Sequence, residues 1–145
     1  MTPASICGPT CGAPLFLHVL GATSLVGDVG TVALLSYIAL RTPAHAVLLR
    51  RLAFATTLVG VWPSLIAMRI GAQWVAEREH LADADVSWIG VGYGVADGGV
   101  ILVALLTFLA WLATRRPRAG TFVAAVALLY LAALGVAMFF MSAKP

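Results

Sequence analysis

Four long runs of apolar residues, separated by short polar segments, dominate the pattern along the chain. The runs cover residues 15–40, 52–71, 95–113 and 121–141. Each is about as long as the 20 or so residues that a helix needs to cross a bilayer. None shows the alternation of a barrel strand, so helices are predicted. With short connections, we predict an all-α integral membrane protein, a single up-down four-helix bundle over residues 1–145.

Charged residues lie between these runs and predict how the bundle is oriented. Two basic clusters, after the first run and after the third, consist of Arg41, Arg50, Arg51, Arg115, Arg116 and Arg118. Because basic loops stay on the cytoplasmic side, both termini are predicted to lie outside, in a bacterial inner (plasma) membrane. The longer connection, 72–94, is predicted to be external. Within it, residues 73–84 are expected to continue the second helix or to lie on the membrane interface as a short helix. A flexible segment is expected at Gly90, Gly92 and Gly94.

Composition supports the membrane prediction and excludes several other classes. Hydrophobic residues make up 61% of the 145 residues and charged residues only 10%, against about 25% charged in soluble domains. A soluble fold would expose large apolar patches, and a disordered chain would be poor in apolar residues. The net charge of +3 comes from loop arginines, so no nucleic-acid partner is expected. Phosphate-binding loops, hydrolase elbows and zinc-protease motifs do not occur, which disfavours an enzyme.

Asp28, midway along the first run, is the deepest ionisable residue. On a helix it shares a strip of small and polar residues with Gly21, Ser24 and Thr31. Such a strip lets another helix approach closely, and its hydroxyls can hydrogen-bond the carboxyl group. A carboxyl group in a span also marks proton and ion pathways. Asp28, with Ser24 and Thr31, is therefore predicted either to hold helices together or to carry protons, cations or a ligand.

Two further ionisable residues, Arg69 and Asp97, lie near the predicted outer ends of the second and third runs. Similar depth and opposite charge predict an ion pair. Alternatively, Asp97 caps the third helix and Arg69 extends to the headgroups. Pro63, in the middle of the second run, is expected to kink that helix. These features predict an ordered bundle rather than a catalytic centre.

His18, Cys7 and Cys11 are the candidate ligands near the outer end of the first run. The imidazole of His18 can ligate heme iron or copper, with His80 as a possible second ligand on the same side, or hydrogen-bond to another helix. Cys7 and Cys11 are spaced to form a small disulfide loop in an oxidising compartment. Together with His18 they can also bind a soft metal ion such as Cu(I).

The stretch Phe16-Leu17-His18-Val19-Leu20-Gly21, followed by Val26-Gly27 and, after the loop, Arg50-Arg51-Leu52, resembles the first-helix signature of small bacterial four-helix membrane families. These are uncharacterised predicted membrane proteins and, more distantly, the copper-resistance D domain and the heme-binding membrane protoporphyrinogen oxidases. The resemblance implies a heme-associated role for His18. The oxidases carry His and Lys where this chain has Gly90 and Gly92, and the arginine they have late in the first helix is absent before Arg41.

Three functional hypotheses follow. The first is a non-enzymatic bundle, free-standing or an accessory subunit, with the lipid bilayer and a membrane protein or a second copy as partners. The second is a heme b- or copper-linked redox or metal-handling protein using His18. The third is a small transporter or proton pathway centred on Asp28.

Overall fold

The computed structural model describes residues 12–78 and 87–142, and within these ranges the chain is a bundle of four long helical segments. The first is α1 (Gly12–Arg41). The second joins a 3₁₀ turn (Pro43–His45), α2 (Ala46–Thr56), a π-helical turn (Thr57–Val61) and α3 (Trp62–Arg78). The third and fourth are α4 (Ser87–Arg115) and α5 (Ala119–Ser142). All four are long and apolar enough to cross a membrane, as predicted.

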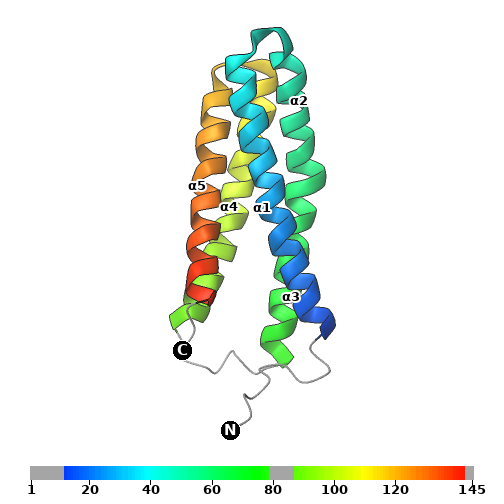
Figure 1. Cartoon of the computed structure of the whole chain (residues 1–145), viewed down its shortest axis with the longest axis vertical. Coiled ribbons are helices and arrows are strands. Elements are labelled where there is room, and N and C mark those ends of the chain that lie inside the picture. The colour runs from blue at the N-terminus through cyan, green and yellow to red at the C-terminus, as the bar shows by residue number, and fades with distance from the viewer. Residues whose placement is uncertain (1–11, 79–86, 143–145) are drawn as a thin grey trace.

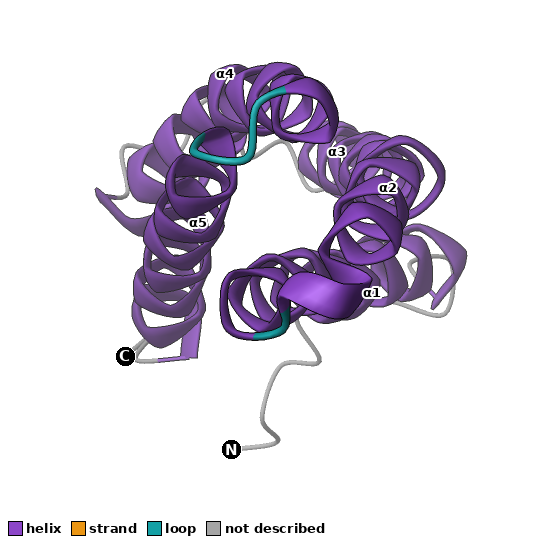
Figure 2. Ribbon diagram, turned by 90° about the horizontal axis from the view of Figure 1, so that it is seen from above, coloured by secondary structure: helices purple, strands orange, loops and turns teal. Residues whose placement is uncertain are grey.

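The helices run up and down and are arranged as a ring when the bundle is seen along its axis (Figure 2). α1 packs on α3 and on α5, and α4 packs on α5 and on α2. The turns α1–α2 and α4–α5 lie at the same end (Figure 1). Because these turns adjoin the two basic clusters, we call it the arginine-rich end. Toward the other end, the α1–α3 pair diverges from the α4–α5 pair.

The core consists of aliphatic and small side chains from all four segments. Leu25, Val32, Leu65, Leu106 and Val123 are almost completely buried in it. Many large apolar side chains remain exposed on the outside of the bundle. An apolar exterior around an apolar core is expected of helices surrounded by lipid, because lipid tails are as apolar as leucine.

Pro63 is accommodated by a wide π-helical turn immediately before it. The N–H of Trp62 bonds to the carbonyl of Thr57, five residues back rather than four. Proline has no N–H to donate, and its ring clashes with the carbonyl four residues earlier. The backbone takes up one extra residue in this turn, and the kink at Pro63 stays a prediction.

Two expectations about the start of the third span are wrong. Gly90, Gly92 and Gly94 lie inside α4 and not in a flexible segment before it. Asp97 is likewise well inside α4, so it cannot be its N-cap. An unpaired backbone group in lipid costs several kcal/mol, whereas a helical glycine costs about 1 kcal/mol, so the helix continues through the glycines. For residues 73–84, one of the two alternatives was a continuation of the second helix. That helix does continue to Arg78, and the rest of the stretch lies outside the described residues.

Candidate functional site: the polar contacts between α1 and α3

Asp28 lies at the interface of α1 and α3, where it is half-buried. The hydroxyl of Ser64 donates a hydrogen bond of 2.7 Å to Asp28 Oδ2. Opposite the carboxylate is Gly60, in the π-helical turn: a Cβ added there would lie 2.8 Å from Asp28 Oδ1. The carboxylate therefore occupies a space that exists because residue 60 has no side chain. The hydroxyl that bonds to Asp28 thus comes from α3 and not from α1, the helix of Asp28 itself.

The expectation that Ser24 or Thr31 bonds the Asp28 carboxylate is not met. Both residues are exposed, and the Thr31 hydroxyl donates to the carbonyl of Gly27 at 2.8 Å. The buried stripe of α1 runs through Leu25 and Val32. Asp28 is at the edge of this stripe, and Ser24 and Thr31 lie farther round the helix and face outward. Sequence analysis missed Ser64, for which the available signal was the small-residue spacing Gly60-x-x-x-Ser64.

His18 contacts the same neighbouring helix, nearer the start of α1. Its Nδ1 lies 3.0 Å from the carbonyl oxygen of Met68. A carbonyl can only accept, so this nitrogen carries the proton, and in the neutral ring Nε2 is left with the lone pair. The contact is the interhelical hydrogen bond that the sequence offered as one alternative to metal ligation. It also fixes the orientation of the ring, as second-shell hydrogen bonds do for metal-binding histidines.

Glycines bring the α1 and α3 backbones into direct contact between these polar groups. A Cβ added to Gly21 would collide with the backbone of Met68, and one added to Gly71 would collide with the backbone of His18. The two contacts are reciprocal, one glycine from each helix. Close approach of backbones through small residues is the main way that helices associate in lipid. This approach brings His18 within reach of the Met68 carbonyl.

Arg69 and Asp97 form the ion pair that the sequence predicted. Arg69 Nη1 lies 2.6 Å from Asp97 Oδ1, and the two side chains are 38% and 67% exposed. It is the one salt bridge within the described ranges 12–78 and 87–142. α3 and α4 otherwise make few contacts. The ion pair therefore connects two helices that diverge toward the end opposite the arginine-rich end. On the same two segments, Trp62 Nε1 donates to Thr107 Oγ1 at 2.9 Å.

The remaining candidate ligands are not assembled around His18 within the described residues. Cys7, Cys11 and His80 lie outside them. His45 is exposed in the 3₁₀ turn of the arginine-rich end, at the opposite end of the bundle from His18. In residues 12–78 and 87–142, no three His, Cys, Asp or Glu side chains come together as a metal site would require.

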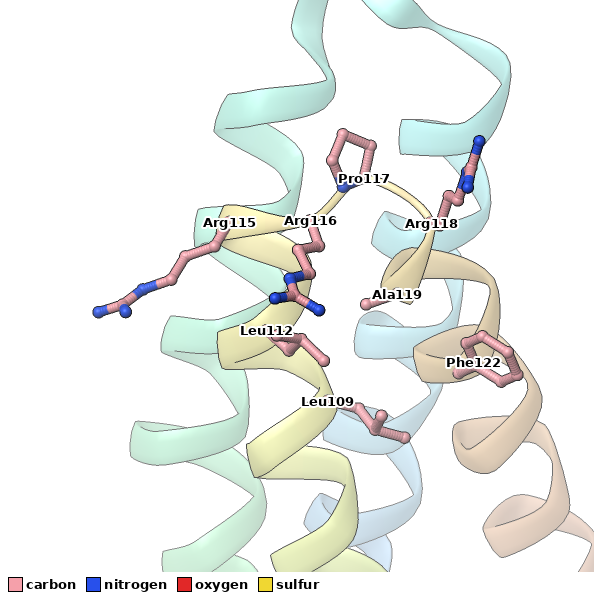
Figure 3. Close-up of a pocket in the computed structure, with 8 residues that line it drawn as sticks. All are labelled: Leu109, Leu112, Arg115, Arg116, Pro117, Arg118, Ala119 and Phe122. Atoms are coloured by element: carbon pink, nitrogen blue, oxygen red, sulfur yellow. The ribbon is translucent and has the colours of Figure 1, made fainter.

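A second polar region surrounds the α4–α5 turn at the arginine-rich end. There an open pocket is lined by the apolar side chains of Leu109, Leu112 and Phe122 and by Arg115, Arg116 and Arg118, of which Arg116 has its guanidinium beside Leu112 and the other two extend away (Figure 3). Sequence analysis used these arginines only to orient the bundle. It did not predict that they border a pocket.

Comparisons with other proteins add nothing to these observations: no family model, curated protein or solved structure matches the chain.

Proposed function

We propose that this chain is a non-enzymatic membrane protein, free-standing or an accessory subunit, whose intramembrane polar groups hold its helices together. The observation that carries the proposal is that His18, Asp28 and Arg69 each bond to a partner on another helical segment. Between helices in lipid there is no hydrophobic driving force, so close packing and hydrogen bonds supply the association energy. The costly polar groups of the spans are thus accounted for by bundle stability.

Paired substitutions at two of these positions test the proposal. Asn at position 28 keeps an oxygen that can accept from Ser64, and Asn at position 18 places an N–H near the position of the imidazole Nδ1. A structural role predicts that Asp28→Asn and His18→Asn remain near the wild-type unfolding temperature and complement a deletion strain. Asp28→Ala and His18→Ala should lose stability and complementation together. An Asn variant that folds normally but fails to complement contradicts the proposal.

As a subunit or a free-standing bundle, the chain has an outer surface suited to lipid and to other membrane helices. Exposed large side chains occur on every helix, for example Phe16, Tyr37, Ile101 and Phe139. We propose a multi-pass protein of the bacterial inner membrane, with the arginine-rich end cytoplasmic and both termini outside, following the positive-inside rule. Cysteine residues introduced at the two ends of the bundle and treated with a membrane-impermeant thiol reagent in intact cells test the orientation. Labelling at the α4–α5 turn by an impermeant reagent would reverse it.

A redox or metal-handling function through His18 is the second candidate, and the bond to Met68 favours it. That bond leaves Nε2 as the free ligand atom of a ring held in one orientation. Bound heme b or copper would supply electron transfer, and His18 is the residue that would hold it. An optical spectrum and metal analysis of the protein in mild detergent, with His18→Ala alongside, test this. A Soret band or stoichiometric copper lost in the variant supports the candidate, and a colourless, metal-free protein from cofactor-replete cells opposes it.

A proton or cation pathway through Asp28 is the third candidate. It is favoured by the π-helical turn beside the carboxylate, since such turns occur frequently at functional sites. Reconstitution into liposomes containing a pH-sensitive dye tests it directly. Flux that is present in the wild type and absent in folded Asp28→Asn supports a pathway. Equal flux in the two proteins rules out a role for the carboxylate.

A further inference from the structure

We propose that the pocket at the α4–α5 turn binds an anionic phospholipid through its phosphate group. The pocket combines two chemistries that follow each other along the bundle axis. Leu109, Leu112 and Phe122 provide an apolar floor, and the guanidinium of Arg116 lies above it, while Arg115 and Arg118 border the pocket with side chains that extend away from it (Figure 3). A phospholipid has the same sequence of chemistries, with hydrocarbon chains next to a charged phosphate. The proposal does not depend on the function proposed above.

The depth of the pocket fits the boundary between hydrocarbon and headgroups. Its floor belongs to the apolar end of α4 and the apolar start of α5, and the arginines begin at Arg115, the last residue of α4. One turn before, the ring of Trp111 lies 4.2 Å from the guanidinium carbon of Arg115. Tryptophan is enriched at this boundary, and a cation over an indole ring is stabilised there. The arginines are therefore at the level of lipid phosphates.

The arginine-rich end of the bundle carries a positive charge that no acidic residue in its two turn segments neutralises, which favours the binding of external anions. Segments 41–51 and 115–118 contain six arginines and no Asp or Glu. The one salt bridge within the described residues joins Arg69 and Asp97, on other parts of the helices. Arginine presents a planar fork of N–H donors that matches a phosphate group. Arg116, whose guanidinium lies beside Leu112 in Figure 3, is the best placed to hold a phosphate above the apolar floor.

The apolar floor indicates a lipid rather than a free phosphate ion. The Phe122 side chain is 62% exposed, next to the arginines. An inorganic phosphate would leave this surface uncovered, whereas an acyl chain would cover it. Basic pockets between transmembrane helices are recognised sites for anionic lipid headgroups.

Native mass spectrometry of the detergent-purified protein tests the proposal. The probes are phosphatidylglycerol and phosphatidylcholine with identical acyl chains. Both lipids carry a phosphate, but the choline cation of phosphatidylcholine is repelled by the arginines, so we expect phosphatidylglycerol to bind about tenfold or more tightly. Arg116→Gln/Arg118→Gln should lose about tenfold in affinity for phosphatidylglycerol, because hydrogen bonds to charged groups are the strong ones. The matched control, Arg41→Gln/Arg51→Gln, removes the same charge from the other turn and should bind as the wild type does.

Equal affinity for the two lipids, or an equal loss in both double variants, would overturn the proposal. Displacement of the lipid by millimolar inorganic phosphate would show that the pocket selects the free ion, which also overturns it. Phe122→Ala should weaken lipid binding, and Arg116→Lys should bind less tightly than the wild type because it keeps the charge but lacks the fork. Because Arg116→Lys keeps the net charge, its affinity for phosphatidylglycerol reports the contribution of the guanidinium group alone. An affinity equal to that of the wild type would contradict the role assigned to Arg116.

Discussion

Replacing Gly21 with alanine should separate α1 from α3. The added Cβ would collide with the backbone of Met68 and lie 3.0 Å from the carbonyl carbon of Ala67. Backbone atoms cannot rotate out of the way as a side chain can. The two helices must therefore move apart, which also stretches the 3.0 Å bond between His18 and the Met68 carbonyl.

The magnitude of this effect follows from the two contacts that are lost. Overpacking a well-packed interface costs about 1–3 kcal/mol. A broken hydrogen bond adds about 0.5–1.5 kcal/mol. Alanine recovers up to about 1 kcal/mol because it is the better helix former. We therefore expect Gly21→Ala to lower the free energy of unfolding by about 2 kcal/mol.

Gly27→Ala and Gly30→Ala are matched controls on the same helix. A Cβ at either position meets no atom within 4 Å. These variants should be neutral or stabilised by up to about 1 kcal/mol. Thermal unfolding in mild detergent, followed by tryptophan fluorescence, compares the three proteins. If Gly21→Ala unfolds at the same temperature as Gly27→Ala, the backbones of α1 and α3 are not in contact and the description of this interface is wrong.

Three further predictions concern individual polar contacts. Tyr130 is 1% exposed, and its hydroxyl has no hydrogen-bond partner within the described residues. Because a buried, unpaired hydroxyl is destabilising, Tyr130→Phe should raise the free energy of unfolding by about 1 kcal/mol. A loss of stability would show that the hydroxyl has a partner. A Cβ at Gly99 would lie 2.6 Å from this hydroxyl, so Gly99→Ala should destabilise the wild type more than the Tyr130→Phe background in a double-mutant cycle. Arg69→Asp or Asp97→Arg alone should lower the free energy of unfolding by more than the about 0.2–1 kcal/mol that an exposed pair contributes, because each brings two like charges together. The reversed pair Arg69→Asp/Asp97→Arg should restore most of this loss, and a double variant no better than the singles would mean that the pair does not connect α3 and α4.

The four spans could be predicted from the amino-acid sequence, because hydropathy over about 20 residues is a property of each segment taken alone. It also offered the contact between Arg69 and Asp97 as one of two alternatives, because their similar depth and opposite charge can be read from their places in two adjacent spans. The up-down order of the helices could also be predicted, because short connections make consecutive helices antiparallel neighbours. The functional hypotheses at His18 and Asp28 remain predictions.

The contact partner of each polar group depends on how the helices pack in the folded chain. The partner of Asp28 is Ser64 because α1 and α3 are rotated so that Gly21 and Gly71 face the opposite backbone. Periodicity along α1 instead favoured Ser24 and Thr31, since a helical pattern groups residues of one helix and does not show how far a neighbour approaches. The arginines around Leu112 and Phe122 could be assigned to a loop from sequence. That they border a pocket depends on how the end of α4 and the start of α5 are packed, which is a property of the folded chain.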